Sequence, residues 1–338
     1  MVAYIIRRLF GAVLTLVVVS MITFGIFYLV PRWAGGTAES LASRYVGRTA
    51  NAQQVADAAH GLGLDKPFFV QYWDWLQAIF VGRDFTGVGP APVHCPAPCL
   101  GYSFIGRNPV LPDILDRLPV TASLAFGAAI IWLIFGVSTG VLSALKRGSI
   151  FDRAAMGVAL GGVSLPIFWT GLVSLVIFSY GLHWTKPGGA YTPIEVNPGE
   201  WAYSLLLPWI TLALLFSAAY ARLTRAGMLE TMGEDYIRTA RAKGLRERTV
   251  VTKHGLRAAL TPIATIFGLD VGLLLGGAVL TESTFSLPGI GKYAIDAINT
   301  NDMPKVMGFV IFSAGFVVIA NLIVDVVYAV IDPRVRLA

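Results

Sequence analysis

Long apolar runs alternate with shorter polar stretches along the chain, and this pattern predicts its organisation. A helix that crosses the hydrocarbon of a bilayer takes about 20 mostly apolar residues and pairs its own backbone polar groups. Six runs meet this requirement, so we expect an all-α integral membrane protein with six transmembrane helices. The predicted spans are residues 9–30, 118–145, 154–182, 201–221, 258–281 and 306–331.

The first run follows Arg7 and Arg8 and so has the basic flank of a signal peptide. The apolar core of a cleaved signal is about 7–15 residues long, whereas this run has 22 residues. We therefore expect residues 1–30 to remain in the protein as an N-terminal anchor helix.

The composition agrees with a membrane protein. Of the 338 residues, 55% are hydrophobic and 14% are charged, whereas globular domains have about 45–50% and about 25%. This balance excludes a soluble fold, a disordered chain and a nucleic-acid-binding arm. The first four spans contain no charged residue, and the last two contain one carboxylate each, Asp270 and Asp325.

Basic residues collect on one side of the predicted topology, and cytoplasmic flanks are where Lys and Arg accumulate. With the N-terminus inside, the cytoplasmic segments are residues 1–8, 146–153, 222–257 and 332–338. They hold 16 of the 26 basic residues and only 6 acidic ones. We therefore expect both termini, including the tail 332–338, in the cytoplasm and residues 31–117 on the extracytoplasmic side.

The predicted extracytoplasmic segment 31–117 is too long for a simple connection. Within it, Pro67 is suited to open a helix, and an aromatic stripe recurs at helical spacing after it. Such a stripe packs a small core or lies at the level of the lipid headgroups more often than it contacts a ligand. The stripe consists of Phe69, Tyr72, Trp73, Leu76 and Phe80.

Cys95 and Cys99 are the two cysteines, and they lie close together in this outer segment, where an oxidising environment allows disulfides. A bridge across so short a loop would stabilise the chain only locally. A zinc site with His94 as a third ligand is the alternative. We favour the disulfide because no fourth ligand is evident and the intervening prolines suit a tight covalent loop.

The cytoplasmic loop 222–257 carries nine basic and four acidic residues, and their order predicts a short helix. Glu234 and Asp235 put negative charge on its first turn, while basic residues follow toward its end. Gly244 provides the left-handed stop. The small or apolar residues Ile237, Thr239, Ala240 and Ala242 leave a slim helix that a groove on a partner could receive.

Residues 233–245 resemble the coupling-helix "EAA" motif of ABC importer permeases, in the form used by the dipeptide/oligopeptide permease family. Residues 62–67 with Gln71 and Tyr72, and residues 282–291, resemble further stretches of that family. The 90–103 insertion that contains both cysteines is unusual for the family. The predicted coupling helix comprises Glu234, Asp235, Tyr236, Ile237, Arg238, Thr239, Ala240, Arg241, Ala242, Lys243 and Gly244.

The resemblance implies the type I permease fold of ABC importers, with a five-helix core over residues 118–331, in a bacterial inner (plasma) membrane. It also implies a subunit that pairs with a second permease of similar fold and with two cytoplasmic ATP-binding subunits. An extracytoplasmic binding protein would deliver the peptide. ATP and Mg²⁺ would be bound by the ATPase partners, so we expect no cofactor on this chain.

Asp270 lies near the middle of its span, where a carboxylate costs about 2.5–3.5 kcal/mol and so faces protein or water. Gly268, Gly272 and Gly276 form a small-residue stripe on another side of the helix, which allows close packing. Two alternatives remain for Asp270. It faces the translocation path and meets the amino group of a peptide, or it makes a structural hydrogen bond to another span.

Two further features concern the translocation path and the shape of the third span. Glu282 and Phe285, at the start of the stretch that resembles the family, are also assigned to the translocation path. Pro166 is expected to kink the third span, because proline removes a backbone donor and clashes with the preceding turn.

We expect no catalytic residue and no metal site on this chain, and therefore no enzyme by itself. Residues 289–292 approach a phosphate-binding loop, but Ser286 stands at the place of its first glycine and Tyr293 follows the lysine. The four histidines are scattered along the chain. The alternatives are a same-family importer of another small solute, such as nickel or glutathione, and a secondary transporter, which would need no coupling helix.

Overall fold

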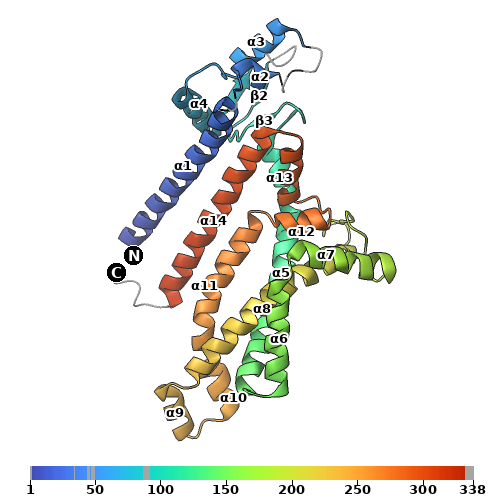
Figure 1. Ribbon diagram of the computed structural model, residues 1–338. Helices are drawn as coiled ribbons and strands as arrows, with labels where there is room; N and C mark the ends of the chain where they lie inside the picture. The colour runs from blue at the N-terminus through green and yellow to red at the C-terminus, as the bar shows by residue number, and fades with distance from the viewer. Residues whose placement is uncertain (1, 34, 44–45, 47–49, 87–91, 332–338) are drawn as a thin grey trace. The chain divides into compact units, whose positions relative to one another are not determined.

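The computed structural model describes residues 2–33, 35–43, 46, 50–86 and 92–331, and these residues are mostly helical (Figure 1). The tail 332–338 and the side chain of Asp325 lie outside the described residues. The chain forms two compact units. We call Val2–Leu118 with Tyr293–Val318 the N-terminal unit, and Pro119–Lys292 with the chain from Ile319 onward the central unit.

The anchor helix groups with the segment 31–117 because its aromatic side chains pack against that segment, and Tyr293–Val318 joins the same unit. The elements of the N-terminal unit are α1 (Val2–Trp33), α2 (Ala38–Ala42), α3 (Ala52–Gly61), α4 (Phe68–Val81), β1 (Arg83–Phe85), β2 (Val93–Cys95), β3 (Tyr102–Ser103), β4 (Asn108–Pro109), and parts of α5 (Val110–Leu145), α13 (Ile290–Asn299) and α14 (Met303–Ile331).

Helix α4 begins after Pro67 and ends at Gly82, whose φ of +83° favours glycine. A Cβ atom on Gly82 would lie 2.7 Å from the carbonyl oxygen of Cys95, so the chain turns tightly there into the antiparallel β1–β2 hairpin. The second hairpin, β3–β4, pairs Tyr102 with Pro109.

The predicted aromatic stripe on α4 is divided between two faces. Tyr72 turns inward, where its hydroxyl lies 2.8 Å from the hydroxyl of Ser20 on α1 and its ring packs against Phe24. Phe69 and Trp73 point outward and are 71% and 62% exposed. The helix is therefore fixed to α1 by one aromatic face and leaves the other face open to its surroundings.

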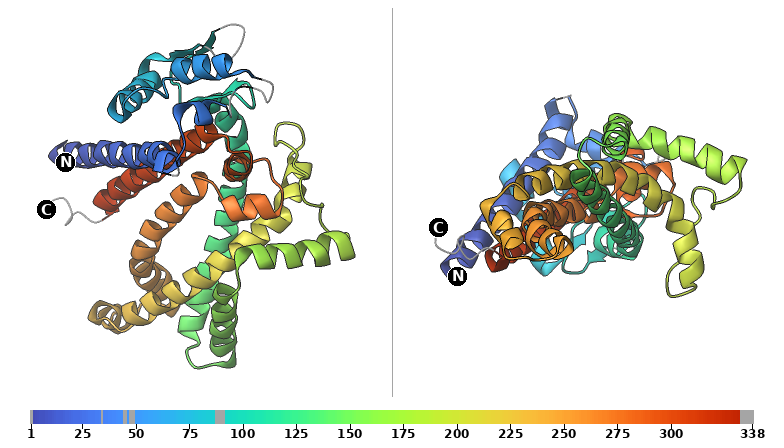
Figure 2. Two further views of the ribbon diagram at one scale, coloured as in Figure 1. Left: turned by 45° about the horizontal axis from the view of Figure 1, so that its top comes forward. Right: turned by 90° about the horizontal axis from the view of Figure 1, so that it is seen from below.

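The central unit contains most of the long apolar helices (Figure 2). Asn197 caps α8, with Pro198 at the first helical position, where its missing N–H costs nothing. The elements are the rest of α5, α6 (Ile150–Ser164), α7 (Ile167–Ser174), the π-helical η1 (Leu175–Gly181), α8 (Pro198–Thr231), α9 (Asp235–Ala242), α10 (Glu247–Thr249), the π-helical η2 (Val250–Gly255), α11 (Leu256–Leu275), α12 (Val279–Thr284), and parts of α13 and α14.

Among the described residues, five helices are long and apolar enough to cross a membrane, and the pair 150–162 and 167–181 makes a sixth if it counts as one span. This pair corresponds to the predicted third span and is bent by 100°. The break falls at Leu165 and Pro166, so the effect of the proline is larger than the predicted kink.

The helix of the fourth span, α8, continues past residue 221 to Thr231 and so includes the first part of the predicted loop. One predicted boundary needs correction. The fifth span ends at Leu275, because Gly277 adopts a φ of +130° and starts a new direction, so its last predicted residues belong to α12.

Glycines of α5 bring it close to α8. A Cβ atom on Gly127 would lie 2.1 Å from the indole of Trp209, and one on Gly140 would lie 2.6 Å from the carbonyl oxygen of Ala221. Between them, Trp132 stacks on Phe216 with ring centroids 4.6 Å apart. Larger residues at the two glycines would separate the helices, so α5 and α8 pack as one layer of the core.

Candidate functional site

The predicted coupling helix is present as α9, which follows α8 after a three-residue turn. Glu234 is its N-cap residue, Asp235 lies in its first turn, and Arg241 in its last turn. Gly244 has a φ of +77°, the left-handed conformation expected at the stop. The helix thus begins one residue after the predicted start and ends two residues before the predicted end.

The inner face of α9 packs against its own loop. Ile237 is fully buried and Ala240 is 6% exposed, and both contact Val250 and Met232. Of the residues expected to make the helix slim, Ile237 and Ala240 lie on the face that packs against the loop. Their small or apolar character is explained by packing within the chain, which fixes the orientation of the helix.

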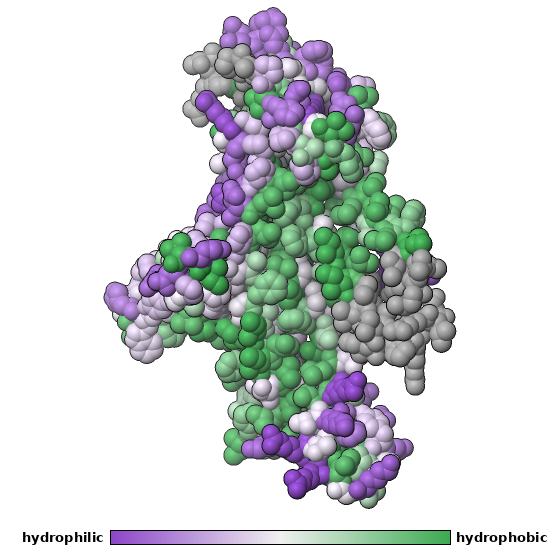
Figure 3. Space-filling view, turned by 180° about the vertical axis from the view of Figure 1, so that it is seen from behind, coloured by the Kyte–Doolittle hydropathy of each residue, from purple (hydrophilic) through white to green (hydrophobic). Residues whose placement is uncertain are grey.

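The outer face of α9 is exposed and mostly polar. Figure 3 shows hydrophilic side chains gathered over this end of the central unit, at the lower edge of the view. Tyr236 is the large aromatic side chain on this face and is 46% exposed. The other exposed residues are Asp235, Arg238, Thr239, Arg241, Ala242 and Lys243.

Ion pairs hold the exposed face in shape. Arg241 donates two hydrogen bonds to Glu247 of α10, at 2.7 and 3.1 Å, across the turn at Gly244. This pairing raises the pKa of Arg241. Arg238 pairs with Asp235 at 3.3 Å within the helix.

A buried ion pair ties the end of α8 to α6. The guanidinium of Arg225 donates to both carboxylate oxygens of Asp152, at 2.6 and 2.8 Å. Asp152 is 4% exposed and also accepts hydrogen bonds from the hydroxyl of Ser143 and the N–H of Gly148. Both oxygens of the Asp152 carboxylate are therefore satisfied. Arg225 lies six residues before the end of α8.

Asp270 makes the structural hydrogen bond that the sequence left open. The hydroxyl of Tyr220 on α8 donates to its carboxylate at 2.7 Å. On another side of α11, a Cβ atom on Gly268 would lie 2.2 Å from a methyl group of Val324 on α14, so Gly268 packs closely as expected. The carboxylate of Asp270 remains partly exposed.

Glu282 and Phe285, which were predicted to lie on the translocation path, are buried within the chain. Glu282 is 0% exposed, and its carboxylate accepts hydrogen bonds from Thr121, at 2.7 Å, and from the N–H groups of Gly291 and Lys292, at 2.7 and 3.0 Å. Burial raises the pKa of Glu282 above its usual value, and the hydrogen bonds from these donors offset only part of that rise. Phe285 is 2% exposed.

The same contacts explain the glycines of residues 289–291. A Cβ atom on Gly289 would lie 2.3 Å from the carboxyl carbon of Glu282, and one on Gly291 would lie 2.6 Å from the backbone of Val279. The backbone thus folds over the Glu282 carboxylate, and this stretch is a structural clasp.

Comparison with known proteins assigns the chain to a family. The family model "Binding-protein-dependent transport system inner membrane component" matches residues 136–337, and a second model, for the N-terminal part of such membrane components, matches residues 1–125. The chain belongs to this family of importer permeases.

The relatives of the permease match over the full length. It is 39% identical to the di/tripeptide transport system permease protein DppB of Pseudomonas aeruginosa and 36% identical to the dipeptide transport system permease protein DppB of Escherichia coli K12, over 99% of each chain in both cases. A putative peptide transport system permease protein of Brucella abortus is 39% identical over 99% of each chain. The predicted membership of the dipeptide/oligopeptide branch is thereby confirmed.

A solved structure described as "Inward facing conformations of the MetNI methionine ABC transporter" matches with a TM-score of 0.51 and 17% identity, covering 65% of this chain and 96% of that chain. The match shows that the permease has an ABC importer permease fold. As a multi-pass inner membrane component of such a transporter, it is not a catalytic subunit.

The cysteines of the permease are joined by a disulfide bond between Cys95 and Cys99. The bond uses both sulfur atoms that the alternative zinc site would need as ligands, so the structure favours the disulfide over the zinc site. Among the described residues, no group of three or more His, Cys, Asp or Glu side chains is placed to hold a metal ion.

Sequence reasoning missed the Asp152–Arg225 pair and the clasp around Glu282. Asp152 and Arg225 are 73 residues apart and looked like ordinary members of charged loops. The signal that pointed to Glu282 was the cluster of glycines seven and nine residues after it, because close backbone approach is a common reason for glycine.

Proposed function

We propose that this permease subunit couples ATP hydrolysis by partner subunits to the import of di- or oligopeptides. The observation that carries the proposal is α9, a short helix with an exposed polar face at the end of α8, in a chain whose full-length relatives are named as peptide permeases. A secondary transporter has no use for such a helix.

The outer face of α9 is the proposed contact with an ATP-binding subunit. Closure of two such subunits around ATP and Mg²⁺, which the partners would hold, displaces α9. The buried contacts of Ile237 and Ala240 keep α9 fixed to its loop, and the Arg225–Asp152 pair links α8 to α6. Displacement of α9 is thereby passed to the long helices of the central unit.

The proposed assembly contains this chain, a second homologous permease, two ATPase subunits and an extracytoplasmic binding protein. The six-span topology, with residues 31–117 outside and both termini in the cytoplasm, is supported by the distribution of basic residues. The exposed apolar surfaces of α5, α6 and α8, which border a hollow of about 580 Å³, suit contact with lipid or the second permease.

Asp270 is the proposed contact with the peptide along the path, since its carboxylate is partly exposed and one of its oxygens is held by Tyr220. Asp270→Asn keeps an acceptor for the tyrosine hydroxyl but removes the charge. We expect the variant to insert normally and to lose peptide transport. Intact transport by Asp270→Asn would limit Asp270 to its structural hydrogen bond.

The function is tested by co-purification and by ATPase assay of the reconstituted complex with its binding protein. A di- or tripeptide is expected to stimulate ATP hydrolysis, and Thr239→Trp on the outer face of α9 is expected to abolish the stimulation. Thr252→Trp, an equally exposed threonine beyond the helix, is the matched control. Stimulation by nickel or glutathione alone would assign the permease to another solute, and a chain that purifies without an ATPase would refute the proposal.

A further inference from the structure

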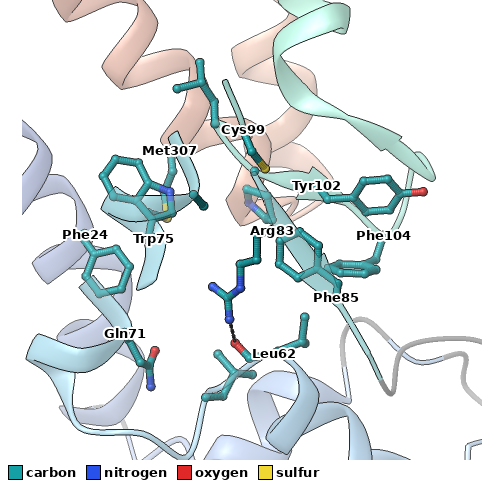
Figure 4. Close-up of a pocket in the computed structure, with 15 residues that line it drawn as sticks. Phe24, Leu62, Gln71, Trp75, Arg83, Phe85, Cys99, Tyr102, Phe104 and Met307 are labelled. Atoms are coloured by element: carbon teal, nitrogen blue, oxygen red, sulfur yellow. Dashed lines mark hydrogen bonds between the residues drawn. The ribbon is translucent and has the colours of Figure 1, made fainter. Parts of the chain in front are cut away.

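The N-terminal unit contains a cavity of about 140 Å³ that the proposed function does not use (Figure 4). Helix α4, strand β1 and the segment that begins at Cys99 form most of its walls, and α1, the turn after α3 and α14 complete them. The cavity is rich in aromatic side chains, and Cys99 of the disulfide faces it as well. The aromatic residues are Phe24, Trp75, Phe85, Tyr102 and Phe104.

Arg83 is the charged residue among the lining residues. Figure 4 shows its guanidinium extending between the aromatic walls, with one hydrogen bond drawn to the backbone of Leu62. That bond, from Nη2 to the carbonyl oxygen, measures 3.0 Å, and the guanidinium carbon lies 5.1 Å from the ring centre of Phe85. Burial lowers the pKa of Arg83, which means that its charge is incompletely solvated.

The charge of Arg83 is not balanced by an ion pair in the described part of the chain. The carboxylate of Asp74 is engaged by Lys66 at 2.6 Å, and that of Asp84 is engaged by His94. A guanidinium has five N–H donors in a planar fork that matches a carboxylate. Asp74 attracts the charge of Arg83 from beyond ion-pair distance. With one hydrogen bond made to Leu62, the guanidinium keeps donors for a ligand in the cavity that it lines.

The size of the cavity limits what it could hold. An apolar cavity of about 150 Å³ takes one benzene-sized molecule, so this one accommodates a single terminal residue rather than a whole oligopeptide. The aromatic walls suit an apolar side chain, and the guanidinium suits the carboxylate beside it.

We propose that this cavity binds the C-terminal residue of a peptide, with its carboxylate on Arg83 and its side chain against the aromatic walls. The inference rests on the proposed function for its ligand, and it gives the unusual cysteine insertion a role. The disulfide holds Cys99 in the cavity wall. Gly101, with a φ of +137°, then turns the chain toward Tyr102 and Phe104.

The site is tested by direct binding to the purified permease complex without its binding protein. The probes are the dipeptide Ala-Phe and its C-terminal amide, observed by saturation-transfer NMR. We expect Ala-Phe to bind, and the amide and the Arg83→Gln variant to show binding about tenfold weaker, because one charge-assisted pair is lost. Arg83→Lys keeps the charge without the fork and is expected to fall between them.

Arg107→Gln is the matched control, since Arg107 is an exposed arginine of the same unit outside the cavity. Equal binding of Ala-Phe and its amide, or binding unchanged in both Arg83 variants, would overturn the site. If Arg83→Gln instead weakens capture of the binding protein and leaves the free peptide unaffected, the cavity docks an acidic side chain of that protein and the proposal is also wrong.

Peptide-stimulated ATPase activity of the wild-type complex separates this inference from the proposed function. Stimulation by Ala-Phe combined with unaltered binding in Arg83→Gln refutes only the cavity. Absence of stimulation by every peptide refutes the function, whereas carboxylate-dependent binding at Arg83 would still support the site as an acceptor of this chemical group.

Discussion

Two short segments between long helices are held in place in different ways. The α9 loop, residues 232–250, has a small apolar contact around Ile237 on one face and charged side chains in solvent on the other. The cysteine segment, residues 83–86 and 92–109, has a covalent bond, two hairpin pairings and edge-to-face contacts between aromatic rings.

The difference indicates where each segment gets its stability. An isolated helix of eight residues is marginal in water, so α9 depends on its buried contacts within the loop, and the proposed partner would add order by covering its outer face. The cysteine segment needs no partner to keep its shape. A preformed wall suits a binding cavity, and a sparsely anchored helix suits a contact that is made and adjusted in an assembly.

Ile237→Ala is expected to have the largest effect, because it empties the apolar contact that anchors α9. Truncation of a buried isoleucine costs about 3 kcal/mol, and here the loss is confined to the loop. Hydrogen exchange of residues 235–242 should accelerate toward the unprotected rate, and peptide-stimulated ATPase activity should fall. Unchanged exchange in this stretch would show that another contact anchors the helix.

Removal of the disulfide by the double substitution Cys95→Ser and Cys99→Ser is expected to have the second-largest effect. The closed loop is short, so the bond contributes about 2 kcal/mol in the chain-entropy model. Thermal unfolding of the N-terminal unit should shift downward while the α9 loop keeps its exchange rates. In the wild type, a thiol reagent should find two thiols only after reduction, and free thiols in the untreated protein would contradict the bridge.

Tyr236→Ala changes the outer face of α9 and should barely alter stability. Exposed side chains without special contacts change the unfolding free energy by about 0.5 kcal/mol or less. We expect normal hydrogen exchange together with weaker retention of the ATPase subunit on co-purification. If retention is unchanged and exchange accelerates, Tyr236 supports the fold of the loop rather than the partner contact.

Glu247→Gln is expected to have the smallest effect, because it removes one partner of the solvent-exposed pair with Arg241. The melting temperature should not change measurably at physiological salt. A clear drop would mean that surface charge, rather than the contact around Ile237, holds the turn at Gly244 closed.

The sequence predicted the long helices well, because length and apolar composition suffice to define a bilayer span. It placed the ends of α9 through Asp235 and Gly244, whose electrostatic and conformational preferences act locally. Its error was at the end of α11, where a glycine interrupts the helix inside the predicted span.

Contacts between segments that are far apart in the chain could not be predicted from the sequence. The sequence marked Glu282 as functional because it lies in a recognisable stretch, yet its partner Thr121 is 161 residues away. Likewise, Ile237 is buried because it packs in a cluster with Val250, and no local sequence pattern identifies that partner. Periodicity shows that a helix has an apolar and a polar face, but only the tertiary packing shows which side chains are buried within the same chain.

The length of α8 has a mechanical consequence. Its 34 residues make a rod about 50 Å long, so a tilt of about 5° at the end beside α9 moves the far end by about 4 Å. The rod contains Pro208, and the close approach of Gly127 to the neighbouring Trp209 braces it at that point. If α9 moves as proposed, its motion would be amplified at the opposite end of α8.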